Sequence, residues 1–330
     1  MAKAWWGVGA AGVVALVVVA LVVVAVLAAA PGPGDRPDGS PGPQERSTGS
    51  PGPQQRSTGS PGLPVPVRVV PDGFPDAAST GVPPGVRLDV VAGDRTFAAD
   101  GEVVEGKEFR GFVTVTARGV TFRKCRFLGG KADRTRPLLD TEHARDTVVE
   151  DSEFHPAHPS PSVDGLWAAR TTILRSEFTG TVDGIKAHTG TVVRDSYIHD
   201  LGWFASDPDQ GGGPTHNDGV QAFAGQTGVT IEHNTIDLST TRDPNAAVQS
   251  SADDLRVEDN YLDGGACVVN LDHTPLGRPL RGQRVTGNRF GRASAYDCPI
   301  LLSTETELSG DGGNVWHDTG GPIPEPERHD

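Results

Sequence analysis

Apolar and polar residues alternate in an eight-residue phrase that returns eight times along the chain. Its third and last positions are apolar and charged residues fall mostly between them, which is the pattern of a half-buried strand. The phrase starts at Val120, Thr147, Thr171, Thr191, Val229, Leu255, Gln283 and, in degraded form, Ser309. Successive starts are 20 to 38 residues apart. A repeat in this range predicts a solenoid, whose coils bury their apolar faces against one another.

A second apolar strand precedes most copies of the phrase. These strands begin at Leu138, Gly165, Gly184, Gly219, Ala247, Val268 and Ile300. Two or three short strands per repeat, with no helical periodicity between them, predict an all-β fold: a single-stranded right-handed parallel β-helix over residues 67–317. Leucine-rich repeats would need their leucine spacing and a helix in each turn, and a propeller blade would need about 40–45 residues.

The sixth position of the phrase is a polar column beside an apolar one. It holds Cys125, Ser152, Ser176, Ser196, Asn234, Asn260, Asn288 and Asn314. We expect an internal ladder at a turn, in which each Asn bonds to its copy in the next coil and tolerates a left-handed backbone. In this column Cys125 is expected to be a buried free thiol.

The two ends of the chain differ from the repeats in composition. Residues 1–30 hold an unbroken apolar run, longer than the roughly 20 residues that cross a bilayer core. An uncleaved transmembrane anchor with the domain outside is favoured, because Pro31 follows the small residues that signal cleavage would need. Secretion after signal cleavage is the alternative. Residues 31–66 predict a disordered Pro/Gly/Ser-rich linker, and residues 318–330 a flexible tail.

Charge and cysteine content narrow the choice of partners. The formal net charge is −14 at pH 7. Nucleic acids and anionic lipid head groups are therefore not expected as partners, because both need a basic protein face. Membrane contact is therefore expected only through the N-terminal helix, and the oligomeric state is left open. Cys267 and Cys298 lie near the starts of adjacent second strands, so an exported chain could join them in a disulfide.

Five short segments resemble a known group of proteins. They are PDAASTGVPPGVRL from Pro75, YIHDL from Tyr197, HNDGVQ from His216, VTIEHNTI from Val229 and GNVW from Gly313. Over residues 75–317 the chain resembles the pectin-lyase-like right-handed parallel β-helix superfamily and, more narrowly, exported actinobacterial-type β-helix repeat proteins. That superfamily includes polysaccharide lyases and glycoside hydrolases, so the resemblance implies an extracellular polysaccharide partner by analogy alone.

The second strands supply the candidate binding face. Strand alternation predicts an outward column and a neighbouring line of side chains. The column holds Asp140, Trp167, Lys186, Gln221, Gln249, Asn270 and Ser303, and the line beside it holds Glu142, His188, Phe223, Asp272 and Glu305. Because aromatic rings stack on sugar rings and amides bond hydroxyls, we expect Trp167, Gln221, Phe223, Gln249 and Asn270 to bind substrate. An ordinary solvated sheet face is the alternative.

The longest interval between repeats contains an insertion from His199 to Asp218, which predicts a functional loop. Within it, His216 and Asp218 are candidate catalytic residues. The alternative is that His199, Asp200 and His216 only tie the loop to the solenoid through hydrogen bonds.

An Asp-Gly pair recurs at Asp164, Asp183 and Asp218, each just before a second strand. Stacked turns are one interpretation, with Asp bonding the backbone and Gly taking a positive φ. The other is a carboxylate pair, Asp183 and Asp218, that shares a proton, holds Ca²⁺ or divides acid and base roles. Ca²⁺ is the one cofactor that the sequence suggests.

Three functions remain open at this point. A β-eliminating lyase would use Lys186 or His188 as its base, with Ca²⁺ neutralising a uronate carboxylate. A hydrolase would use Asp183 and Asp218, although the NTD, GHG and RIK motifs of polygalacturonases are missing from the sequence. A non-catalytic glycan-binding or structural stalk protein is the third, so whether the chain is an enzyme is undecided.

Overall fold

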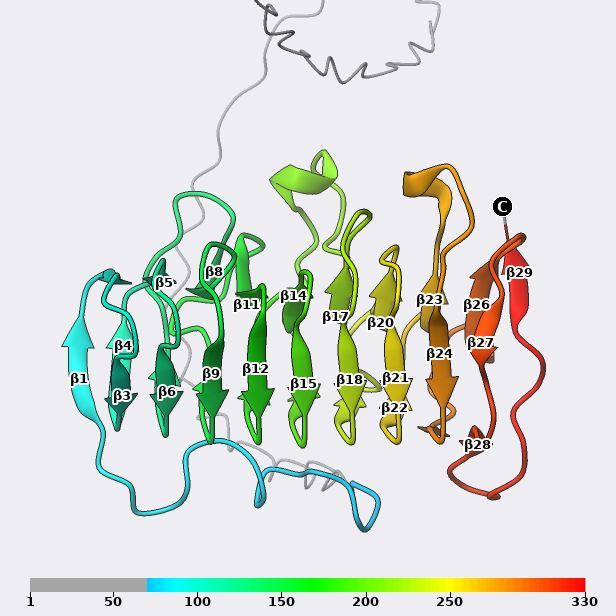
Figure 1. Ribbon diagram of the computed structural model, residues 1–330, viewed down its shortest axis with the longest axis horizontal. Helices are drawn as coiled ribbons and strands as arrows, with labels where there is room; N and C mark the ends of the chain where they lie inside the picture. The colour runs from blue at the N-terminus through cyan, green and yellow to red at the C-terminus, as the bar shows by residue number, and fades with distance from the viewer. Residues whose placement is uncertain (1–69, 330) are drawn as a thin grey trace, which may run out of the picture. The chain divides into compact units, whose positions relative to one another are not determined.

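The described residues form a parallel β-helix. The computed structural model describes residues 70–329, so the predicted membrane segment and the whole predicted linker lie outside the described residues. Each coil contributes one strand to each of three parallel sheets, here named A, B and C, and successive coils stack side by side (Figure 1). The right-handed solenoid predicted from the repeat is confirmed.

The strands are short, and their bounds follow the repeat. Sheet A contains β1 (Asp89–Ala92), β4 (Lys107–Arg110), β7 (Arg126–Phe127), β10 (Glu153–Phe154), β13 (Glu177–Phe178), β16 (Tyr197–His199), β19 (Thr235–Asp237), β22 (Tyr261–Asp263), β25 (Arg289–Phe290) and β28 (Val315–Trp316). Sheet B contains β2 (Arg95–Phe97), β5 (Val113–Val115), β8 (Arg136–Asp140), β11 (Val163–Ala168), β14 (Ile185–Ala187), β17 (Asp218–Ala222), β20 (Ala246–Ser250), β23 (Cys267–Leu271), β26 (Cys298–Ser303) and β29 (Glu327–His329). Sheet C contains β3 (Val103–Glu105), β6 (Thr121–Arg123), β9 (Thr147–Glu150), β12 (Thr171–Leu174), β15 (Val192–Arg194), β18 (Thr230–Glu232), β21 (Arg256–Glu258), β24 (Gln283–Thr286) and β27 (Leu308–Gly310). Two 3-10 helices, η1 (Pro208–Gln210) and η2 (Thr274–Leu276), lie in loops.

The eight-residue phrase forms two strands, one in sheet C and one in sheet A. Its fifth residue lies at the turn between them and takes a left-handed backbone. The six non-glycine copies are Lys124, Asp151, Arg175, Asp195, His233 and Asp259, and Gly287 and Gly313 follow them. The expectation that the sixth residue takes this conformation was wrong, because the bend lies one residue earlier.

The polar ladder predicted at the sixth position is confirmed. The backbone N–H and the Nδ2 of Asn260 each donate to Oδ1 of Asn288 at 3.0 Å. The serine copies do the same with hydroxyls, since the N–H of Ser176 donates to Oγ of Ser196 at 3.1 Å. These buried groups would each cost about 1–3 kcal/mol if left unpaired. Cys125 is a buried free thiol.

Stacked side chains fill the interior of the solenoid. The rings of Phe109, Phe127, Phe154 and Phe178 follow one another in sheet A, with centroid separations of 5.1, 4.6 and 4.3 Å. Such aromatic pairs add about 0.5–1.5 kcal/mol each to their apolar burial. The hydrophobic core belongs to the compact unit formed by residues 64–330.

Residues 70–88, here called the strap, precede β1 and cross the turns between sheets C and A (cyan in Figure 1). The ring of Phe74 stacks on that of His233 with centroids 5.9 Å apart, and the N–H of Gly81 donates to the carbonyl of Arg175 at 2.9 Å. The strap therefore joins coils that are far apart in the sequence.

The C-terminal segment was expected to be a flexible tail, but the structure differs. β29 pairs with β26 and extends sheet B, and Ile323 packs against the core. An apolar anchor and a main-chain partner thus hold residues that lie beyond the last copy of the phrase. Among residues 70–329, no helix has the length and apolar character that crossing a bilayer requires.

Candidate functional site

The outer face of sheet B carries one row of side chains in register. The pairing of neighbouring strands aligns Trp167, Lys186, Gln221, Gln249 and Asn270 across five coils. All five are half-buried, whereas the residues before and after each of them along the strand are buried. The structure therefore places these five residues in the outward column, where strand alternation put them.

The two ends of this row differ in their agreement with the sequence. Asp140 pairs with Trp167 and begins the row as expected. After Asn270 the row continues to Leu301, whereas Ser303 is fully buried. The predicted place of Ser303 was wrong, because β26 begins earlier in the sequence than the pattern indicated.

A second line of side chains follows two residues after the row. The His188 ring lies 5.7 Å from the ring of Phe223, and its Nε2 is 3.1 Å from Oε1 of Glu142. Burial lowers the pKa of His188, and the carboxylates of Glu142 and Asp140 oppose this effect only in part. The imidazole is therefore neutral at pH 7, as a proton acceptor must be.

Three aspartates stack at the start of sheet B, one in each of three successive coils. Oδ1 of Asp183 accepts the N–H of Asp218 at 2.9 Å, and Oδ1 of Asp164 accepts the N–H of Asp183 at 3.4 Å. Oδ1 of Asp218 accepts from Nδ2 of Asn245 at 2.8 Å. The turn interpretation is thus right about the aspartates, since each carboxylate bonds the next coil.

The glycines that follow these aspartates have a different role from the one expected. None of Gly165, Gly184 and Gly219 has a positive φ. A Cβ on Gly184 would lie 2.5 Å from the Gly219 carbonyl oxygen and 2.8 Å from the side chain of Ile198. Glycine is therefore required here by close approach between coils.

One lysine is the cation of this cluster. Nζ of Lys186 lies 2.7 Å from Oδ2 of Asp164 and 3.3 Å from Oδ2 of Asp183. The same oxygen of Asp164 accepts from Nε1 of Trp167 at 2.8 Å. Asp164 therefore orients both the tryptophan and the lysine of the row.

The cluster holds more acid than base. Burial, with Asp164 beside it, raises the pKa of Asp183 well above its usual value, although Lys186 opposes the shift. Burial also raises the pKa of Asp218 to about 7, and its Oδ2 is buried with no hydrogen-bond partner among the described residues. Burial opposes the charge of Lys186, but the carboxylates of Asp164 and Asp183 prevail and raise its pKa. An amine that stays protonated cannot accept a proton, so this arrangement speaks against Lys186 as a base.

The aspartate cluster does not fit Ca²⁺. Within residues 70–329, no three His, Cys, Asp or Glu side chains are grouped as ligands for a metal ion. The carboxylates of Asp164 and Asp183 already contact the Lys186 ammonium, so the positive charge of the lysine would repel a second cation. The pair predicted to hold the ion, Asp183 and Asp218, is joined by a main-chain bond.

The long insertion is fixed by a residue that the sequence did not single out. Nδ2 of Asn217 donates to the carbonyls of Val182 and Gly202 at 2.7 and 2.8 Å, and its Oδ1 accepts from Thr215. His216 lies between these buried residues but is itself exposed, and it takes no part in the contacts of the aspartate cluster. The predicted combination of His216 with Lys186 is therefore not assembled.

The structure brings together Cys267 and Cys298, the cysteines that the sequence pairs. They face each other on β23 and β26 with Cα atoms 4.8 Å apart and form a disulfide. The disulfide joins β23, which carries the last row residue Asn270, to the next coil.

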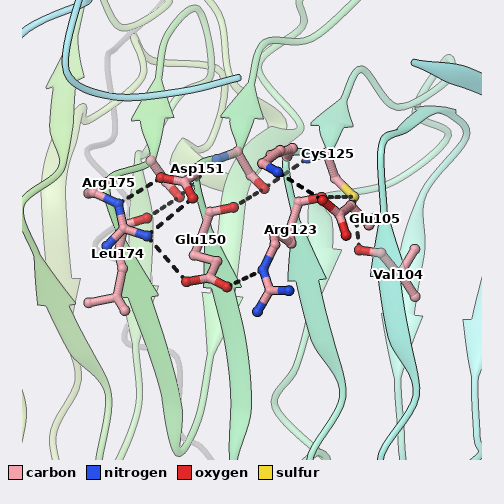
Figure 2. A network of polar contacts seen from close by, with 11 residues as sticks. Val104, Glu105, Arg123, Cys125, Glu150, Asp151, Leu174 and Arg175 are labelled. Carbon is pink, nitrogen blue, oxygen red and sulfur yellow. Dashed lines mark hydrogen bonds and ion pairs between the residues drawn. The ribbon is translucent and has the colours of Figure 1, made fainter. Parts of the chain in front are cut away.

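Charged residues on sheet C are arranged differently. Arg175 contacts both Glu150 and Asp151, and Arg123 contacts the other oxygen of Glu150, so acids and bases alternate between coils (Figure 2). The side chains of Arg123 and Arg175 are 42% and 40% exposed. Each of these charged side chains is paired with an opposite charge, and both arginines are partly exposed to solvent. None of them is therefore a buried ion without a counter-charge.

The residues that sequence reasoning missed are partners of the predicted ones. Asp164 belongs to the Asp-Gly column, and that signal pointed to it without indicating its contacts with Trp167 and Lys186. No signal marked Asn245 or Asn217, because each acts across coils that are many residues apart in the sequence.

Comparison with known proteins adds little to this description. The sequence matches no family model, and no curated protein matches it. A solved structure described as "a new PL6 alginate lyase complex with trisaccharide" is similar, with 11% sequence identity and a TM-score of 0.42. The match covers 69% of this chain and 54% of that protein. At this level the similarity carries no argument about function.

Proposed function

We propose that the protein binds a linear polysaccharide across the outer face of sheet B. The observation that carries the proposal is the in-register, half-buried row from Trp167 to Asn270. Neighbouring strands lie about 4.8 Å apart, so a polymer laid across them meets one side chain in each coil. Gln221, Gln249 and Asn270 carry amide groups that can donate to and accept from sugar hydroxyl groups.

Two aromatic side chains in and beside the row support a sugar ligand. Trp167 lies in the row, and Phe223 is 36% exposed in the neighbouring line. Because Nε1 of Trp167 is bonded to the buried Asp164, the indole is held in one orientation before any ligand arrives. A preoriented aromatic surface loses little side-chain entropy on binding.

Cleavage is a second candidate function, and His188 favours it. Its neutral imidazole, 3.1 Å from Glu142, could take the proton next to a uronate carboxylate. The electron pair released from that C–H bond would form a C=C bond as the glycosidic C–O bond breaks, and the departing oxygen would take a proton from water. A positive charge for the uronate would have to come from elsewhere, because Asp164 and Asp183 already pair with Lys186. Hydrolysis by Asp183 and Asp218 is less well supported, because both carboxylates are buried beneath the row.

We propose that this binding takes place outside the cytoplasm, with the domain anchored in the cell membrane or secreted. The disulfide supports an oxidising compartment. The apolar run of residues 1–30 and the resemblance to exported β-helix proteins support the same location. A non-catalytic cell-surface stalk remains the contrasting function.

Binding is tested by affinity electrophoresis of residues 64–330 through gels that contain neutral or uronic polysaccharides, with and without Ca²⁺. This segment forms one compact unit. We expect retardation by at least one polysaccharide, and Trp167→Ala should lose it. Tyr296→Ala is the matched control, because Tyr296 is 73% exposed and lies outside the row. If no polysaccharide retards any of the three proteins, the structural stalk is the function that is left.

Cleavage is tested on the polysaccharides that bind. Growth of ultraviolet absorbance from unsaturated ends would establish a lyase, and His188→Ala should then abolish it while keeping the affinity. Reducing ends without absorbance would establish a hydrolase instead and would point to Asp183 and Asp218. Binding with neither product would leave a glycan-binding protein.

A further inference from the structure

The N-terminal end of the solenoid is open. β1, β2 and β3 are the terminal strands of their sheets, so each has one unpaired edge among the described residues. The end is hollowed by a cavity of about 500 Å³, lined by apolar side chains that include Val91, Phe97 and Phe109. Val90 and Val103 are 53% and 62% exposed there, which makes them two of the four exposed large hydrophobic residues of the described chain.

The C-terminal end is closed by the chain itself. The segment after Trp316 returns across the last coil, with Ile323 packed against the core and β29 added to sheet B. Pro322, Pro324 and Pro326 lie in this segment, and proline offers no N–H to an incoming strand. Pro322 forms a bridge with Val315 of β28, so the apolar interior is covered at this end. The first coil lacks any equivalent cover among the described residues.

The entry point of the chain argues against its own preceding residues as the cover. Val70 lies beside Arg289 and His317, on β25 and just after β28. β25 is eight interstrand steps from β1 in sheet A, which is roughly 38 Å at about 4.8 Å per step. The strap runs from there back to β1, so the described chain begins near the far end of the solenoid.

We propose that the open end is an interface with the same end of a second copy of this chain, related by a two-fold axis. An isologous contact places each patch against itself, so the exposed valines of one copy meet those of the other. The rim supports self-recognition, because Arg95 and Glu102 have opposite charges and neither has an ion-pair partner within residues 70–329. A two-fold axis would pair Arg95 of each copy with Glu102 of the other.

A dimer of this kind accounts for both ends at once. Solenoids need polar caps at their terminal repeats to remain soluble. Pairing two uncapped first coils removes both apolar surfaces from water and leaves the two proline-containing ends outward. The contact closes after two copies, so it does not propagate into a filament.

The test measures the mass of residues 64–330 by light scattering after size exclusion, over a wide range of concentrations. The proposal expects a dimer that dissociates on dilution, and Val103→Asp should shift it to monomer at every concentration. Because the Val103 side chain is exposed, the circular dichroism spectrum should stay unchanged. The thermal midpoint should equal that of the wild type at concentrations where the wild type is monomeric. Val90→Asp repeats the test on another strand, and Tyr296→Asp, a change of the same kind away from this end, should remain dimeric.

Three results would overturn the proposal. A wild-type monomer at all concentrations excludes the interface, and species that keep growing with concentration indicate a head-to-tail contact. If residues 64–330 dimerise but the full chain in detergent is monomeric, the N-terminal residues cover the end instead. Charge reversal sharpens a positive result: Arg95→Glu and Glu102→Arg should each weaken the dimer, and the double variant should restore it.

Discussion

Charged side chains stack between coils on two faces of this solenoid, but only one of the two stacks is balanced. On sheet C, Arg123 and Arg175 alternate with acids and are about two-fifths exposed. At the start of sheet B, three aspartates share Lys186, and the side chains of Asp164 and Asp183 are 2% and 5% exposed. Alternating exposed charges hold coils in register at little cost, whereas an unbalanced buried cluster is expensive and therefore calls for a role beyond register.

The role that fits is control of the binding row. Asp164 orients Trp167 and Lys186 through a single oxygen, and Asp183 in the next coil contacts the same ammonium group. The sheet C stack touches no comparable row. The two stacks should therefore respond very differently to the loss of one basic residue.

The largest expected effect is that of Lys186→Met. Removing the cation leaves three buried carboxylates without a counter-charge, which should lower the free energy of unfolding by about 3 kcal/mol at pH 8. The loss should be smaller at pH 5, because the raised pKa values of Asp183 and Asp218 let these two carboxylates take up protons. Urea denaturation at the two pH values measures both figures, and an equal loss at each would argue that packing alone is affected.

Asp218→Asn should change how stability depends on pH. An unfolded aspartate loses its proton near pH 4, whereas Asp218 keeps it to about 7. Because the folded state binds the proton more tightly, the free energy of unfolding falls as pH rises from about 4 to about 7, by a few kcal/mol. The variant should flatten that fall. Asp146→Asn, at an exposed ion pair, is the control and should leave the slope intact.

A smaller, local effect is expected at His233, which holds the strap. Its Nδ1 lies 2.6 Å from Oδ1 of Asp195 and its Nε2 lies 3.0 Å from the carbonyl of Gly73, so both partners are acceptors and only the protonated ring serves both. Burial opposes that charge, but the bonds to Asp195 and Gly73, with Asp259 nearby, raise the pKa of His233. Arg175 lies across the same cavity.

The strap should therefore be held most firmly at low pH. The stabilisation by His233 is complete below its unfolded pKa of about 6.5 and is lost as pH rises through the raised folded value. The protection of residues 73–82 from hydrogen exchange, relative to the intrinsic rate at each pH, should fall above that range. His233→Gln should abolish this fall. His143→Gln, at an exposed histidine, should not. If protection in His233→Gln depends on pH as it does in the wild type, protonated His233 does not hold the strap.

The smallest effect is expected for Arg123→Met on sheet C. An exposed ion pair contributes little to stability, so the unfolding free energy should change far less than in Lys186→Met. High salt should reduce even that difference, since it screens exposed charges. A loss comparable to that of Lys186→Met would erase the distinction between the two stacks.

The sequence sufficed for the coils because their causes are local and repeated. The apolar columns and the Asn ladder each recur once per coil, so the register of Gln221 with Gln249 followed from the spacing alone. What failed was conformation within the repeat: the left-handed residue lies one place earlier, and Gly184 serves close approach. Some residues that bond to another coil left no periodic signal, such as Asn245 with Asp218 or Asn217 with Val182. The C-terminal strand β29 also lacks the phrase, so composition alone suggested a tail.

The central claim is that a polysaccharide covers the row on sheet B, and hydroxyl-radical footprinting tests it most directly. Residues 64–330 would be oxidised with and without each polysaccharide of the panel, and oxidation rates would be compared at Trp167, Phe223 and Tyr296. The account predicts slower oxidation of Trp167 and Phe223 with at least one polysaccharide, and an unchanged rate at Tyr296. Unchanged rates at Trp167 and Phe223 throughout the panel would contradict it.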